Sequence, residues 1–310
     1  MLRVTSSPHV RDVRTTRSVM GDVACALIPA GAFGVYYFGY RAAIVILISC
    51  VAAVLSEFLY NRLAHRKQTI GDLSAVVTGL LLAYNLPASV PYWMPAVGAA
   101  IAILLVKMIF GGLGHNFVNP ALAGRAILMT SWLSYMSGSA FELAVRGVDA
   151  VSTATPLLRE YDLWQLFIGQ APGCIGEVSK LALLVGGAYL VVRGVITWHI
   201  PVAMTVTVFV LSWITSGALV GSVDSGVYQI LSGGLLLGAI FMATDYSTSP
   251  VTWVGKLIFG VGCGLVAFVI RYFSSMAEGV SYSILFMNLF VPLIDRFTKP
   301  RVYGEGKKHA

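Results

Sequence analysis

Charged side chains are scarce in this chain, and that scarcity decides the class of protein. Only 11% of the 310 residues are Asp, Glu, Lys or Arg, whereas 57% are hydrophobic, and the mean hydropathy is +0.80. Soluble domains carry roughly 25% charged residues. The composition therefore excludes an ordinary soluble enzyme and predicts a chain that lies mostly within a membrane.

Cysteine is also scarce, and its spacing excludes the common metal centres. The 4 cysteines form no CxxC and no Cys/His pattern typical of zinc or iron–sulfur ligands, so we expect no metal site. The first twenty residues are polar and basic, without the apolar core of a cleavable signal peptide, and we expect none. We predict no catalytic residue, and the net charge of +7 requires no nucleic acid to explain it.

The apolar runs are about as long as a bilayer-spanning helix, which needs roughly 17–25 residues. Room for about ten such runs predicts an all-α integral membrane protein, with a single membrane domain over residues 1–310. The expected spans cover residues 19–40, 42–60, 73–86, 92–110, 121–136, 177–192, 198–219, 227–243, 252–273 and 280–297.

The basic residues predict the orientation of these spans, because cytoplasmic loops carry an excess of Lys and Arg. With the N-terminus in the cytoplasm and ten crossings, the outer loops hold only Arg41, Arg146, Arg159, Lys180 and Arg271. The cytoplasmic side then holds Arg3, Arg11, Arg14, Arg17, Arg62, Arg66, Lys67, Lys107, Arg193, Arg296, Lys299, Arg301, Lys307 and Lys308. We therefore expect both termini in the cytoplasm.

A faint internal repeat relates the two halves. Residues 79–83 read GLLLA and residues 234–238 read GLLLG, and polar, Pro-containing breaks follow at 85–87 and 244–250. Superposing them lays spans one to five on spans six to ten, in opposite orientation because five is odd. Inverted repeats with interrupted helices place binding sites at their interface, although GLLL also recurs by chance in Leu-rich chains. We predict repeat 1 at about 19–136 and repeat 2 at about 177–297, joined by a loop at about 137–176 and flanked by basic tails at 1–18 and 298–310.

The longest polar interval holds the run DAVSTATP at residues 149–156. By composition alone it is a Ser/Thr-rich turn that Pro156 stops from continuing as helix. It also resembles the acceptor motif of flavin transferases, Asp-x-x-Ser/Thr-Gly-Ala-Thr, whose last Thr is esterified to the phosphate of FMN. Thr153 stands where Gly is usual. The motif is otherwise matched by Asp149, Ser152, Ala154 and Thr155.

A second polar stretch runs from Gly111 to Arg125 and reads GGLGHNFVNPALAGR. Asn116 and Asn119 offer hydrogen-bond donors and acceptors at membrane depth, and Pro120 suits the first turn of a helix. A charge on Arg125 is costly there, so it needs a partner or a bound anion. A tight interhelical turn with a snorkelling Arg is the plainer interpretation.

Several motifs together extend the resemblance over nearly the whole chain. They are Ser7-Pro8-His9, the stretch 111–125, the Thr155 motif, Ile175-Gly176-Glu177 and Met242-Ala243-Thr244-Asp245. In combination the chain resembles the D subunits of Rnf complexes. The B subunits of sodium-pumping NADH:quinone reductases are the paralogous alternative, but they have a longer N-terminal extension. The resemblance implies a subunit of a translocase that couples electron transfer between ferredoxin and NAD⁺ to Na⁺ or H⁺ movement, with no catalysis by the subunit alone.

The resemblance also implies cofactors, partners and location. FMN would be bound covalently to Thr155 on the outer face of a bacterial or archaeal inner (cytoplasmic) membrane, attached by a flavin transferase. The expected partners are the FMN-bearing G subunit and the membrane A and E subunits. A second, non-covalent flavin, riboflavin, would be held by Asn116, Asn119 and Arg125.

Carboxylates near span ends are the candidates for ion movement, because they bind Na⁺ through oxygen or relay protons. They are Glu57, Asp72, Glu177 and Asp245, of which Asp245 and Asp72 are the preferred pair. Helix-end roles are an equally good interpretation, and the residues do not decide between Na⁺ and H⁺. A urea-channel-like solute channel is a further alternative, since urea channels share the inverted five-span plan, but it has no need of the Thr155 motif.

Overall fold

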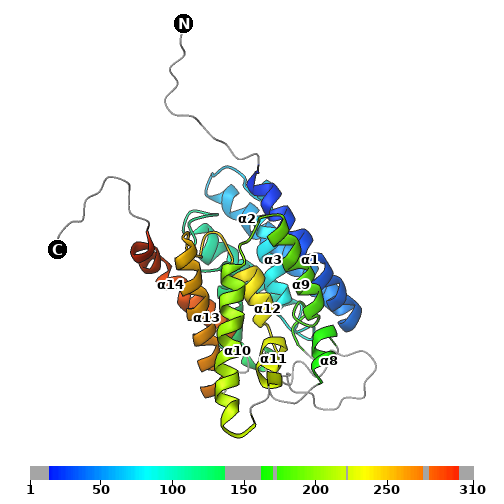
Figure 1. Ribbon diagram of the computed structural model, residues 1–310. Coiled ribbons are helices and arrows are strands. Elements are labelled where there is room, and N and C mark those ends of the chain that lie inside the picture. Colours follow the sequence, from blue (N-terminus) through cyan, green and yellow to red (C-terminus); the bar gives the residue numbers. More distant parts are fainter. Residues whose placement is uncertain (1–13, 137–161, 170–172, 221–222, 275–278, 300–310) are drawn as a thin grey trace, which may run out of the picture.

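The computed structural model describes residues 14–136, 162–169, 173–220, 223–274 and 279–299, and the regular secondary structure of this part is entirely helical (Figure 1). This confirms the all-α prediction. The first half contains α1 (Thr16–Phe38), α2 (Tyr40–Leu63), η1 (Ile70–Asp72), α3 (Ser74–Tyr84), α4 (Trp93–Ile101), η2 (Ala102–Met108), α5 (Pro120–Ser131) and α6 (Leu133–Met136). The second contains α8 (Leu163–Ile168), α9 (Lys180–Val192), α10 (His199–Val220), α11 (Val223–Leu231), α12 (Leu235–Leu237), η3 (Gly238–Met242), α13 (Trp253–Phe273) and α14 (Val280–Thr298).

Several helices are long and apolar enough to cross a bilayer, and the protein is a multi-pass membrane protein. In the described part of the chain, α1, α2, α13 and α14 each meet the length and hydropathy of a span, and a bent pair of helices makes a fifth. The described part also contains shorter apolar helices, at residues 74–84, 93–108, 180–192 and 199–215.

Helix starts follow from side chains that accept hydrogen bonds from otherwise unsatisfied backbone N–H groups. Thr15 caps α1 by accepting from Ser18 N at 3.2 Å, and Thr252 caps α13 through Gly255 N at 3.0 Å. Asn119 caps α5, with Pro120 at its first position. The sequence 119–120 therefore starts a helix for a local reason, as its Pro predicts.

The apolar run expected as a span at 227–243 is helical in the structure but broken. Residues 225–231 and 235–242 form two helical pieces that bend by 65°. Gly233 has φ +62, a left-handed conformation that Gly adopts without the steric cost of a side chain. The sequence predicts an interruption only after this span, at 244–250, whereas the Gly233-Gly234 pair interrupts the helix earlier.

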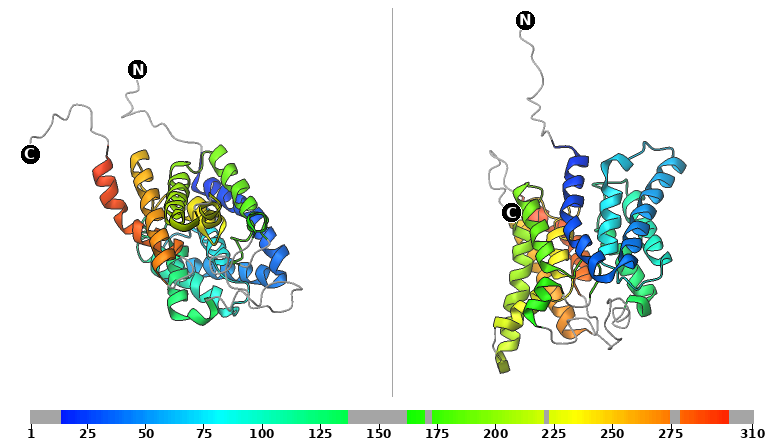
Figure 2. Two further views of the ribbon diagram at one scale, coloured as in Figure 1. Left: turned by 60° about the horizontal axis from the view of Figure 1, so that its bottom comes forward. Right: turned by 90° about the vertical axis from the view of Figure 1, so that its right-hand side faces the viewer.

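The helices divide into two halves that pack in the same pattern. In the right-hand view of Figure 2 the blue-to-teal helices α1–α5 occupy one side and most of the green-to-orange helices the other. In the first half α2 packs against α3 and α4, and α4 against α5; in the second, α10 packs against α11 and α13, and α13 against α14. The two halves meet where α1 packs against α9 and α5 against α14.

Small residues allow the central helices to approach closely, as in other membrane bundles. A Cβ at Gly186 of α9 would lie 2.3 Å from the backbone oxygen of Ala26 in α1. The contact between α1 and α9 therefore depends on the absence of a side chain at this position.

The end of the expected loop at 137–176 lies inside the bundle. Cys174 and Ile175 are fully buried. Ile175 N donates to Leu86 O at 3.1 Å, and Gly176 N donates to Tyr84 O at 3.0 Å. The backbone that leaves the end of α3 would otherwise have unpaired polar groups in the core. Segment 173–176 supplies their partners.

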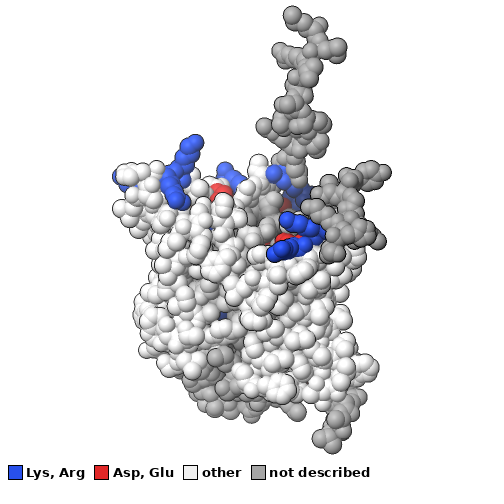
Figure 3. Space-filling model, turned by 90° about the vertical axis from the view of Figure 1, so that its left-hand side faces the viewer, with Lys and Arg blue, Asp and Glu red and all other residues white. Residues whose placement is uncertain are grey.

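On the face of the bundle seen in Figure 3, charged side chains lie mainly at one end. In Figure 3 the Lys and Arg side chains on the visible face gather at the end where α1 begins, and the rest of that face is almost uncharged. An uncharged belt next to a charged end is the surface that a membrane protein presents to lipid and to water.

Candidate functional site

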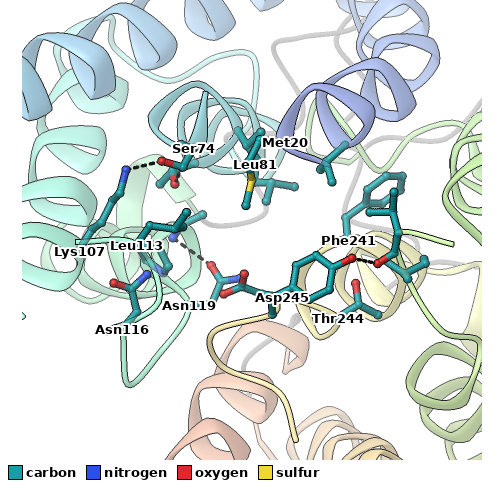
Figure 4. Close-up of a pocket in the computed structure, with 18 of the residues that line it drawn as sticks. Met20, Ser74, Leu81, Lys107, Leu113, Asn116, Asn119, Phe241, Thr244 and Asp245 are labelled. Carbon is teal, nitrogen blue, oxygen red and sulfur yellow. Dashed lines mark hydrogen bonds between the residues drawn. The ribbon is translucent and has the colours of Figure 1, made fainter. Parts of the chain in front are cut away.

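The site that the fold creates is a pocket between the two halves (Figure 4). It lies among α1, α3, η2, the 109–119 segment, the start of α5 and the chain that follows η3. The inner pocket is narrow, about 60 Å³, and it shares Met20, Leu113, Asp245 and Tyr246 with an outer pocket of about 620 Å³. The polar side chains of the inner pocket are Ser74, Thr78, Lys107, Asn116, Asn119, Thr244, Asp245 and Tyr246.

Asn119 connects the two halves at the pocket. Its Oδ1 accepts from the backbone N–H groups of Ala121 and Leu122 at 3.0 and 3.3 Å, which caps α5. Its Nδ2 donates to Met242 O at the end of η3, at 3.2 Å. One buried amide thus fixes the first half against the broken helix of the second, through both its oxygen and its nitrogen.

Asn116, unlike Asn119, has a side-chain oxygen without a hydrogen-bond partner in the described part of the chain. Its side chain lines the inner pocket and is 6% exposed. Its Oδ1 is buried without a hydrogen-bond partner among the described residues. A buried acceptor left unpaired costs about 1–3 kcal/mol, so this oxygen is suited to accept from a bound molecule.

Asp245 lines the inner pocket together with Asn116 and Asn119, and it also lines the outer pocket. Its Oδ2 accepts from Ser247 Oγ at 2.8 Å and from Thr248 Oγ1 at 3.1 Å. These bonds hold the carboxylate in the turn that follows η3. Next to it the Tyr246 hydroxyl donates to Val195 O, which ties the same turn to the end of α9.

A buried ion pair forms another wall of the pocket. Lys107 of η2 is 2% exposed, and its Nζ donates to Glu57 Oε2 of α2 and to Ser74 Oγ of α3, both at 2.6 Å. The other carboxylate oxygen of Glu57 accepts from Thr69 Oγ1. Ser74 in turn donates to Asp72 Oδ1, which also accepts from Ser74 N at 2.8 Å. The preferred ion candidate Asp72 therefore starts α3 and contacts the pocket only through Ser74.

Arg125 lies away from the inner pocket, whose lining does not include it. Its guanidinium donates to Asn85 Oδ1 at 2.9 Å, to Ser281 Oγ at 2.7 Å and to Cys174 Sγ at 3.7 Å. Arg125 thus joins α3, α5, α14 and the buried segment 173–176. It meets the expectation that a charge at this depth faces polar partners rather than lipid.

Glu177 belongs to the same buried region rather than to a solvated span end. It is 2% exposed, and its Oε1 accepts from Cys174 N at 2.8 Å. Lys180 Nζ donates to Glu177 O and to Gly233 O, the latter at 2.8 Å. Arg271 Nη2 donates to Ser232 O at 3.1 Å. Two basic side chains therefore cap the carbonyl groups that the break at 232–234 leaves free.

The FMN acceptor motif at Asp149, Ser152, Ala154 and Thr155 lies outside the described residues. The roles of these four residues stay predictions from the sequence.

Comparison with known proteins decides the family. The family described as NQR2, RnfD, RnfE matches residues 3–304. The chain belongs to this family. It is 45% identical over 317 residues to the D subunit of the Na⁺-translocating ferredoxin:NAD⁺ oxidoreductase complex of Acetobacterium woodii, with 99% of this chain and 96% of the relative covered. It is 43% identical to the proton-translocating counterpart of Clostridium ljungdahlii (97% and 96% covered) and 36% identical to the D subunit of the ion-translocating oxidoreductase complex of Cronobacter sakazakii (98% and 99% covered).

Membership of the NQR2, RnfD, RnfE family confirms the resemblance inferred from the motifs. Asn116, Asn119 and Asp245 stood out in the sequence, and the structure brings all three to one pocket. The pairing of Glu57 with Lys107 was not predicted. The sequence could have indicated this pair, because each of two apolar runs carries one isolated charge. Opposite charges at membrane depth usually form ion pairs with one another.

Proposed function

We propose that this chain is the flavin-carrying membrane subunit of an Rnf-type complex, which couples electron transfer between ferredoxin and NAD⁺ to the movement of Na⁺ or H⁺. The observation that carries the proposal is the pocket between the halves, where Asn116 presents an unpaired buried acceptor and Asp245 is a second polar lining residue. The names of the relatives supply the reaction of the whole complex. The part of this chain is to bind and separate redox groups, and flavin would supply the electron-transfer chemistry.

FMN is proposed as an ester of its phosphate with Thr155. The support is the match of Asp149, Ser152, Ala154 and Thr155 to the acceptor motif of flavin transferases. Thr155 supplies the hydroxyl oxygen that the ester requires, whatever the effect of Thr153 on the local turn.

A second flavin, riboflavin, is proposed for the pocket. Its imide edge carries N–H and C=O groups, which suit the Asn116 acceptor and the Lys107 donor. The inner pocket of about 60 Å³ is too small for the ring system alone, but the adjoining 620 Å³ lies within the roughly 300–1,000 Å³ of ordinary ligand sites. The Met20 and Leu113 side chains stand between the two pockets and would move aside. Arg125 was also predicted to bind this flavin, and its position suggests an indirect part, through the helix that Asn119 starts.

The two halves are proposed to be inverted five-helix repeats within a bundle of about ten spans. The support is the matching packing of α2–α3–α4–α5 and α10–α11–α13–α14, with the pocket at their interface. The concentration of basic residues at one end supports cytoplasmic termini, and hence an extracytoplasmic Thr155. The G, A and E subunits of such complexes and a flavin transferase are the proposed partners.

Asp245 and Asp72 are proposed to take part in ion movement. Asp245 supports this better, because it lines both pockets and lies at the end of the broken helix. The relatives include both a Na⁺-translocating and a proton-translocating complex, and a carboxylate can serve either ion.

Flavin analysis of the purified complex tests the proposal. Acid precipitation should leave one flavin bound to this chain and release another that is not covalently held. In the variant Asn116→Leu the released flavin should fall while the bound one stays. Ser49→Ala is a matched control, because Ser49 is also a buried polar residue, whose hydroxyl donates to Gly79 O rather than facing the pocket. Equal release from both variants would contradict the placement in the pocket.

A further inference from the structure

A continuous chain of hydrogen bonds runs from the protein surface to the inner pocket. It begins at Thr69, which is exposed in the segment between α2 and α3. Thr69 Oγ1 donates to one oxygen of Glu57, whose other oxygen accepts from Lys107 Nζ at 2.6 Å. Lys107 lines the pocket. Each of these contacts is a direct one between side-chain polar atoms, and two of the three groups can gain or lose a proton.

The buried pair is poorly explained as a stabilising element. Glu57 is 0% and Lys107 2% exposed, and withdrawing two charges from water costs several kcal/mol each, which their attraction often fails to repay. Ionisable groups at membrane depth are functional by default for this reason. Lys107 also lies in η2, a stretch of π-helix, and such stretches occur frequently at functional sites.

Lys107 has a further N–H donor that can serve a molecule in the pocket. An ammonium group has three N–H donors, and the described acceptors, Glu57 Oε2 and Ser74 Oγ, use two of them. In Figure 4 the Lys107 amine points to Ser74 at the wall of the cavity. The other titratable groups near these hydrogen bonds are Asp72, which accepts from Ser74 Oγ, and Asp245 and Tyr246, which line the same pocket as Lys107.

We propose that Thr69, Glu57 and Lys107 form a proton relay that connects the aqueous phase at the charged end of the bundle with the occupant of the inner pocket. This inference rests on the proposed flavin there. A flavin bound there would supply the electron-accepting chemistry, and Lys107 Nζ would be the group that donates a proton toward it on reduction. Glu57 then passes a proton from solvent, received by way of the Thr69 hydroxyl, back to Lys107. Only N–H and O–H bonds form and break, and one proton enters from solvent for each one delivered.

The test measures proton uptake separately from electron arrival in the purified complex. A pH-indicator dye follows uptake from the medium while the flavin absorbance follows its photoreduction, and acid extraction gives the flavin content. Glu57→Gln keeps the size and shape of the side chain, retains one acceptor oxygen toward Lys107 or Thr69, and cannot pass a proton. Because proton transfer by a positioned side chain contributes roughly 10²–10⁴-fold, we expect uptake at least about tenfold slower, with the same flavin content and the same photoreduction rate.

Variants at the exposed end keep the inference testable if Glu57→Gln fails to assemble. Thr69→Val removes the hydroxyl and should slow uptake, whereas Thr69→Ser should restore it. Ser49→Ala, in the same helix as Glu57, should behave as wild type. Wild-type uptake rates in Glu57→Gln and Thr69→Val, with flavin retained, would overturn the relay alone. A wild-type complex without extractable flavin would overturn the proposed flavin site and the relay together.

Discussion

Removing the charge of Lys107 should destabilise the protein more than removing any exposed charge. In Lys107→Met the Glu57 carboxylate, which is 0% exposed, would lose its 2.6 Å partner. Breaking a buried ion pair from one side costs about 3–5 kcal/mol, because the remaining charge is uncompensated. The carboxyl group can escape part of this cost by taking up a proton, so the lower end of the range is expected near neutral pH.

Replacing both members of the Glu57–Lys107 ion pair together should cost much less stability than replacing one. In the double variant Glu57→Leu/Lys107→Met, apolar side chains of similar volume fill the same space, and such replacements are often neutral or stabilising. The assay is denaturant unfolding of the detergent-solubilised protein for the wild type, both single variants and the double variant, analysed as a double-mutant cycle. The expected coupling is favourable and on the order of the single-variant loss.

The exposed pair Arg193–Asp22, with N and O atoms 3.2 Å apart, is the control. Arg193→Met should leave the unfolding midpoint almost unchanged, because solvated ion pairs contribute little. A Lys107→Met variant as stable as wild type, with zero coupling in the cycle, would refute the reasoning about the buried pair.

Three further predictions concern packing, the pocket and ion movement. Gly186→Ala should lower stability and weaken the contact between α1 and α9, because the new Cβ would lie 2.3 Å from Ala26 O. Thermal unfolding compares it with Gly71→Ala, whose Cβ would meet nothing within 4 Å and which should leave stability unchanged. Asn119→Ala should lower the free energy of unfolding by about 1 kcal/mol, because α5 loses its N-cap. It should also reduce the extractable flavin, because the hydrogen bond to Met242 O is lost. Unchanged stability would contradict the capping role. Asp245→Asn should impair ion-coupled turnover while the complex still assembles, and unchanged turnover and ion flux would remove Asp245 from the pathway.

Much of the fold was predictable because membrane helices are encoded by local apolar runs. The long helices α1, α2, α13 and α14 lie close to the expected spans. The break at Gly233 was missed because a hydropathy pattern does not distinguish a continuous apolar helix from two short helices at an angle. The buried course of 173–176 was missed because Gly173, Cys174 and Gly176 have the composition of a loop, while their partners on α3 are distant in sequence.

The candidate site was predictable in part, and for a definite reason. Asn116, Asn119 and Asp245 stood out as polar residues between apolar runs, and the structure places all three in the lining of one pocket. Arg125 lay in the same sequence motif, but helix α5 carries it away from that pocket, toward Asn85 and Ser281. Neighbours in a motif share a site only when the helix geometry brings their side chains to the same place.

The central claim, that this chain carries flavin covalently, is tested most directly by fluorescence under ultraviolet light after denaturing electrophoresis. The chain is compared with and without a co-expressed flavin transferase, and beside Thr155→Ala. The account predicts a fluorescent band that requires the transferase and is absent from Thr155→Ala, although that variant inserts normally. A dark wild-type band in the presence of the transferase, or a band that persists in Thr155→Ala, would contradict it.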